Sequence, residues 1–140
     1  MKLSHIGIAV RDLGKAELLF RTLLGNGKIH HEEVVDQAVR IASFDLDGSR
    51  IELTEPMNDD SPISKFLTKR GEGIHHIAFE VNDVAAELAR LKRDGVELID
   101  EKPRLGSHGM LIAFLHPKST NGVLIELCQN GTLLPRKEGE

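Results

Sequence analysis

Apolar and polar residues alternate in a short stretch near the start of the chain, and the same alternation returns in the second half. Residues 5–10 read HIGIAV and residues 76–81 read HIAFEV. Each stretch is followed within two residues by an aspartate and then by apolar residues at helical spacing. This order is typical of a strand followed by a capped helix. The pattern therefore predicts two copies of one structural unit.

Strand-like and helix-like runs then follow in the same order in both halves. We expect helices after Asp12, ending at Gly25, from Pro62 to Thr68, and from Asp83 to Asp94. Asp47-Gly48 predicts a hairpin turn. The expected strands are residues 4–10, 29–35, 38–46 and 50–55 in the first half and 74–81, 96–99, 110–115 and 123–128 in the second.

Each half thus reads as a βαβββ module. A module of about 65 residues with one sheet face uncovered is too small to be stable alone. We therefore expect an α+β fold in which two tandem modules form one curved mixed sheet. The expected organisation is a single domain over residues 1–130, with modules at about 3–56 and 74–129, a linker at 57–73 and a polar tail at 131–140.

Composition excludes several classes of function. The net charge of −4 over 140 residues, without a dense basic stretch, argues against nucleic-acid binding. No apolar run approaches the length of a membrane span, so we expect no membrane association. The single cysteine, Cys128, cannot form an internal disulfide, which fits a reducing compartment and predicts a cytoplasmic location.

Two histidines and two glutamates occupy matched positions in the two copies. From His5 to Glu52 is 47 positions, and from His76 to Glu126 is 50. Strand alternation places all four on the face opposite the main apolar stripe. A duplicated fold brings equivalent positions together, so we expect one metal ion in the concavity of the sheet. Two imidazoles and two carboxylates suit zinc, cobalt, nickel, iron or manganese.

The remaining candidate residues are weaker, because each has an ordinary structural interpretation. His75 falls on the apolar side of its strand, and the pair His30-His31 is expected to be exposed. His108 lies between glycines in a loop that could close over a ligand. Lys118 could meet a phosphate or could simply be solvated. An isolated His or Glu in a strand is also usually structural, so the metal hypothesis depends on the matched repetition.

Several stretches resemble the vicinal oxygen chelate superfamily and, within it, the methylmalonyl-CoA epimerase family. The resemblance extends to about residue 129, and its most specific part is the last of five stretches. These stretches are residues 51–56 (IELTEP), 60–67 (DSPISKFL), 73–79 (GIHHIAF), 108–109 (HG) and 114–127 (FLHPKSTNGVLIEL).

The resemblance implies an isomerase that interconverts (R)- and (S)-methylmalonyl-CoA by α-proton abstraction and enolate stabilisation. It places metal ligands at His5, His76 and Glu126, with Glu52 as the fourth. Glu126 and Glu52 are then also the candidate catalytic bases. The implied cofactor is one divalent ion, with cobalt preferred over zinc, nickel or manganese. The implied partners are an acyl-CoA substrate and a second copy of the chain.

The sequence departs from the family at one position, because Ile41 stands where some epimerases have a catalytic Glu. Alternatives therefore remain open. A glyoxalase I-type lactoylglutathione lyase would use the same His/Glu/His/Glu set, although residues 114–127 favour the epimerase. A metal-free binding or resistance protein would not need all four ligand positions filled. An iron dioxygenase would not need Glu52 as a fourth ligand.

Overall fold

The computed structural model describes residues 1–25 and 27–130, and the tail expected at 131–140 lies outside the described residues. The elements follow the expected β-α-β-β-β order in each half. Two compact units are present among the described residues: Leu3–Ala78, and Met1–Lys2 together with residues 79–130. The α+β class is confirmed, while the single domain over residues 1–130 stays a prediction.

The first unit is a mixed sheet with strand order β2-β3-β4-β1-β5. The pairs β2–β3 and β3–β4 are antiparallel, whereas β1 runs parallel to β4. The parallel pair arises because a helix connects β1 to the rest of its module. The strands are β1 (Lys2–Ala9), β2 (Ile29–Val34), β3 (Val39–Leu46), β4 (Ser49–Pro56) and β5 (Gly73–Glu80).

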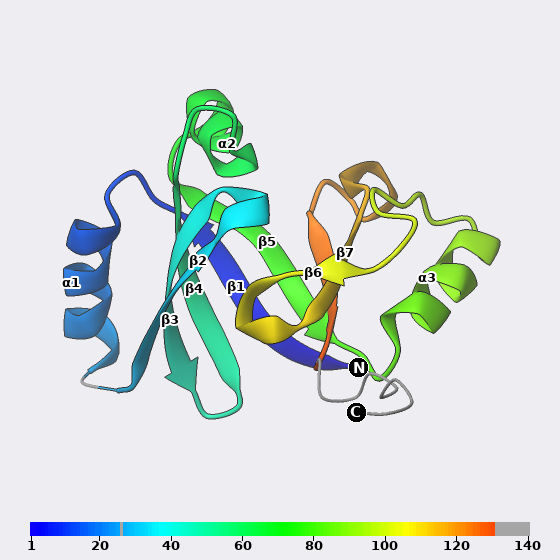
Figure 1. Ribbon diagram of the computed structural model, residues 1–140, viewed down its shortest axis with the longest axis horizontal. Coiled ribbons are helices and arrows are strands. Elements are labelled where there is room, and N and C mark those ends of the chain that lie inside the picture. The colour runs from blue at the N-terminus through cyan, green and yellow to red at the C-terminus, as the bar shows by residue number, and fades with distance from the viewer. Residues whose placement is uncertain (26, 131–140) are drawn as a thin grey trace, which may run out of the picture. The chain divides into compact units, whose positions relative to one another are not determined.

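Helix α1 (Leu13–Leu24) covers the apolar face of this sheet, as Figure 1 shows. The Asp12 carboxylate accepts a hydrogen bond from the Lys15 amide at 3.1 Å and so caps the first turn. Phe20 packs into a cluster with Phe44 and Leu53, which face α1 from neighbouring strands. The predicted cap and the predicted apolar stripe of the sheet are both confirmed.

The hairpin between β3 and β4 forms where the sequence predicts it. Asp47 and Gly48 have φ angles of 49° and 101°. Positive φ at both central residues is the condition for the tight turn that matches strand twist. This turn sets the register in which Ser43 lies opposite Glu52.

Helix α2 (Pro62–Arg70) extends two residues beyond the expected end at Thr68. Ile63 and Leu67 pack against Ala9 and Ile41, which belong to the polar-facing side of their strands. The connecting helix therefore covers part of the face that carries the histidines and glutamates. Sequence patterning did not indicate this packing.

The second unit contains the end of β5 and a sheet in the order β8-β7-β6. Val84 and Leu88 of the helix pack against Leu127 in one apolar cluster. No helix within residues 1–25 and 27–130 is long and apolar enough to cross a membrane. The elements are α3 (Val84–Arg93), β6 (Arg104–Leu105), β7 (Leu111–Leu115) and β8 (Ile125–Gln129).

The prediction of a strand at residues 96–99 is wrong. Only Leu98 forms an isolated bridge there. The Ile99 and Asp100 amides both donate to the Phe114 carbonyl, at 3.0 and 3.2 Å. The Phe114 amide donates to the Asp100 carboxylate at 2.8 Å instead of to a backbone carbonyl. A side chain thus replaces the ladder partner, and regular pairing stops.

Candidate metal centre

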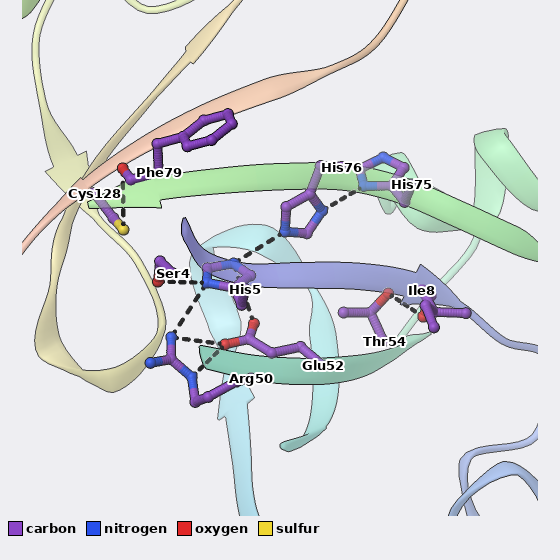
Figure 2. Close-up of polar contacts among 10 residues, drawn as sticks. All are labelled: Ser4, His5, Ile8, Arg50, Glu52, Thr54, His75, His76, Phe79 and Cys128. Atoms are coloured by element: carbon purple, nitrogen blue, oxygen red, sulfur yellow. Dashed lines mark hydrogen bonds and ion pairs between the residues drawn. The ribbon is translucent and has the colours of Figure 1, made fainter. Parts of the chain in front are cut away.

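Three of the four predicted ligands lie together in the first unit, on three neighbouring strands. His5 is on β1, Glu52 on β4 and His76 on β5, and their candidate ligand atoms all lie within 4.8 Å of one another. The His5 Nε2 atom is 3.2 Å from His76 Nε2 and 3.5 Å from Glu52 Oε1. Figure 2 shows the three side chains converging from their strands. All three are buried, with at most 7% of their surface exposed.

Gly7 makes this convergence possible. A Cβ atom added at Gly7 would lie 2.1 Å from His76 Cε1, which is far inside van der Waals contact. The His76 ring therefore occupies the space that any other residue at position 7 would fill. The space above Gly7 is therefore taken by the side chain of a candidate ligand.

Arg50 and Ser4 hold the cluster from one side, and no sequence motif predicted a role for either residue. Arg50 Nε and Nη2 donate to Glu52 Oε2 at 3.2 and 3.1 Å, and Nη2 also donates to His5 Nδ1 at 3.2 Å. The Ser4 hydroxyl lies 3.0 Å from the same nitrogen of His5. The spacing in the sequence could have indicated Arg50, because it lies two residues before Glu52 and therefore on the same face of the strand.

Ser43 adds a buried hydroxyl next to the cluster. It lies opposite Glu52 in the β3–β4 register and is 1% exposed. Within the described residues its Oγ atom has no hydrogen-bond partner. A lone serine in a strand carries no sequence signal for such a position.

Glu126 lies on β8 in the second unit and is 5% exposed. Its neighbour Leu127 packs into the apolar cluster of that unit, so the predicted alternation along this strand is confirmed. Participation of Glu126 in the metal site stays a prediction.

The exposed candidates His30, His31 and Lys118 lie outside the cluster, whereas His75 contacts His76 with their Nδ1 atoms 2.9 Å apart. The side chains of His30 and His31 are 58% and 57% exposed, and they pair with Glu32 and Glu17. The exposed polar pair is therefore confirmed. Lys118 Nζ forms an ion pair with Glu97 Oε2 at 2.8 Å.

The residues present fit a divalent ion. Two ring nitrogens and one carboxylate oxygen, all buried and close together, are donors that borderline divalent metals accept. The space needed by His76 exists only because position 7 is glycine. The half-buried Arg50 holds one oxygen of Glu52 and leaves the other directed toward His5.

Residues 4–114 match the Glyoxalase/Bleomycin resistance protein/Dioxygenase superfamily. The chain belongs to this superfamily. The match includes His5, Glu52 and His76, and it agrees with the resemblance read from the sequence motifs.

Relatives over nearly the whole chain include named epimerases. The ethylmalonyl-CoA/methylmalonyl-CoA epimerase of Cereibacter sphaeroides is 40% identical over 91% of this chain and 97% of its own length. The uncharacterized protein YqjC of Bacillus subtilis is 44% identical over 91% of both chains.

Solved structures agree with the fold. A variant of Streptomyces coelicolor methylmalonyl-CoA epimerase, in complex with 2-nitronate-propionyl-CoA, superposes with a TM-score of 0.88. It is 41% identical, and the alignment covers 93% of this chain and 97% of that one.

Proposed function

We propose that this protein is a metal-dependent epimerase that interconverts (R)- and (S)-methylmalonyl-CoA. The observation that carries the proposal is the buried group of His5, Glu52 and His76 in a chain 40% identical to a named epimerase. The solved relative in complex with an acyl-CoA analogue supports an acyl-CoA substrate.

In this proposal His5, Glu52, His76 and Glu126 hold one divalent ion, with cobalt preferred and zinc, nickel or manganese as alternatives. A bound ion would act as a Lewis acid that stabilises the charge on substrate oxygens when the α-proton leaves. A metal-soaked crystal should show these four side chains within about 2.0–2.3 Å of one ion.

Epimerisation also requires groups that remove a proton from one face of the α-carbon and return it to the other. We assign the first role to Glu126. Ile41 cannot serve, because it is an apolar residue packed in the cluster beneath α2. We assign the second role to Glu52. Arg50 donates two hydrogen bonds to Oε2, and Oε1 faces the proposed ion, so Glu52 would take up the proton by releasing one of these contacts.

Two further properties belong to the proposal. We propose that the protein is a homodimer, as the superfamily resemblance implies, and sedimentation equilibrium should give twice the 15.5 kDa chain mass. A cytoplasmic location is supported by the acyl-CoA substrate and by the lone, buried Cys128.

The reaction class can be tested directly by incubating cobalt-loaded protein with one epimer of methylmalonyl-CoA in heavy water. Deuterium should appear at the α-carbon while the other epimer accumulates. Accumulation without deuterium would contradict proton abstraction, and absence of both would contradict the epimerase assignment. Metal-stripped protein is the control and should lose the exchange.

A further inference from the structure

Three histidines and one arginine form a continuous row of polar contacts through the metal centre. Arg50 Nη2 contacts His5 Nδ1 at 3.2 Å, and His5 Nε2 contacts His76 Nε2 at 3.2 Å. His76 Nδ1 in turn lies 2.9 Å from His75 Nδ1. Figure 2 shows the row passing from Arg50 to His75.

The arginine determines the direction of every hydrogen bond in the row. A guanidinium only donates, so His5 Nδ1 must accept. A neutral imidazole carries one N–H, which places the His5 proton on Nε2, where it faces His76 Nε2. His76 Nε2 then accepts, and the His76 proton lies on Nδ1. That proton points to His75 Nδ1, which accepts it.

We infer that His75 is a positioning residue for His76, and this rests on the proposed metal site. By accepting the Nδ1–H of His76, His75 keeps the Nε2 lone pair directed toward His5 and Glu52. Ligand histidines commonly donate their second N–H in this way, which fixes both tautomer and ring orientation.

His75 is itself held in place by the helix that connects the halves. The Phe66 ring on α2 meets the His75 ring edge to face, with centroids 5.0 Å apart. His75 therefore links α2 to the metal centre. This role accounts for His75, the first histidine of the His75-His76 pair, which strand alternation assigned to the apolar side.

His5 differs from His76 in one testable respect. With Arg50 donating to Nδ1, the Nε2 of His5 carries a proton and cannot bind an ion until that proton leaves. When the proton moves to Nδ1, the Ser4 hydroxyl, 3.0 Å away, accepts it, and Arg50 Nη2 then donates to Glu52 Oε2 alone. Metal binding should therefore change the tautomer of His5 and leave that of His76 unchanged.

Long-range ¹⁵N–¹H NMR of uniformly labelled protein reads these tautomers without any activity measurement. In metal-free wild type we expect His76 protonated on Nδ1 and His5 on Nε2. Addition of Zn²⁺ should move the His5 proton to Nδ1 only. A metal-free His76 with its proton on Nε2 would overturn the inference.

Two substitutions at His75 separate the hydrogen bond from the ring. Asn carries an oxygen on Cγ, where His carries Nδ1, so His75→Asn keeps an acceptor, whereas His75→Leu removes it. By titration calorimetry, His75→Leu should weaken Zn²⁺ binding about 10–100-fold, as loss of such a partner typically does. His75→Asn should stay close to wild type, and the exposed His31→Asn is the control.

The remaining outcomes are also decisive. Equal losses in His75→Leu and His75→Asn would show that the ring packs without positioning His76, and no loss in His75→Leu would likewise overturn the inference. If wild type itself binds no divalent ion, the proposed metal site is wrong. The tautomers of His75 and His76 in metal-free protein still test the positioning role of His75, so the two failures can be told apart. Circular dichroism of each variant checks that it is folded.

Discussion

At the scale of single residues, one missing side chain determines whether the metal centre can form. Gly7 lies on β1 beneath the ring of His76, on the neighbouring strand. Its role is steric, because a Cβ there would overlap three ring atoms at 2.1 to 2.6 Å. The backbone is not strained at this glycine, so the constraint comes entirely from its neighbour.

Gly7→Ala should therefore displace His76 and weaken Zn²⁺ binding by at least about 10–100-fold, which is the loss typical of a misoriented ligand. Titration calorimetry measures the loss. Gly27→Ala is the matched control, because no heavy atom lies within 4 Å of a Cβ added there. Unchanged affinity in Gly7→Ala would contradict the convergence of the three ligands.

The two glutamates can be separated by amide substitution. Glu126→Gln removes the proposed first base, so activity should fall by about 10²–10⁴-fold, the usual loss for general-base catalysis. Glu52→Gln keeps an oxygen ligand and should show a similar fall if Glu52 transfers the second proton. The measurement is epimerisation rate at saturating Co²⁺. Full activity in Glu52→Gln would assign Glu52 to ligation alone.

At the scale of elements, the second module departs from the first where a side chain interrupts a strand pair. The Asp100 carboxylate accepts the Phe114 amide at 2.8 Å and also pairs with Arg104 at 3.2 Å. These contacts hold the segment that leads into β6 while preventing a regular strand at residues 96–99.

Asp100→Ala should lower the free energy of unfolding by about 1–3 kcal/mol, because the Phe114 amide loses its acceptor. Asp100→Asn retains a side-chain oxygen and should lose less. The exposed Glu101→Ala is a control at a neighbouring acidic residue, which pairs with Lys92 on the surface. Urea denaturation monitored by circular dichroism compares the three variants. Equal stability of Asp100→Ala and Glu101→Ala would show that the bond contributes nothing.

At the scale of the whole molecule, two enzyme classes that use the same type of metal site must be distinguished by their substrates. Glyoxalase I-type lyases and methylmalonyl-CoA epimerases both stabilise an enolate-like charge beside a metal. The Cereibacter sphaeroides relative at 40% identity is named as an epimerase, and so is the Streptomyces coelicolor structure at a TM-score of 0.88. Both alignments cover over 90% of this chain.

We therefore expect turnover of methylmalonyl-CoA and negligible formation of lactoylglutathione from the glutathione hemithioacetal. Parallel assays with the same cobalt-loaded preparation make the comparison. Comparable rates for both substrates, or turnover of the hemithioacetal alone, would overturn the assignment. Deuterium exchange at the α-carbon provides an independent check on the first substrate.

Local sequence patterns were sufficient to predict the features that depend on residues close together in the chain. The repeated strand and helix order, the Asp12 cap and the Asp47-Gly48 turn follow from local patterns. Alternation also assigned His5, Glu52 and His76 to the same side of their strands, because side chains in a strand alternate with a period of two.

The contacts that each side chain makes across neighbouring strands could not be predicted from such local patterns. The overlap of Gly7 with His76, the contact of Arg50 with His5 and the packing of α2 over Ile41 depend on strand order and register. The missing strand at residues 96–99 has the same origin, since a carboxylate replaced its backbone partner. Local periodicity shows which face of a strand a residue occupies, but the distances between side chains on neighbouring strands depend on strand order, register and packing.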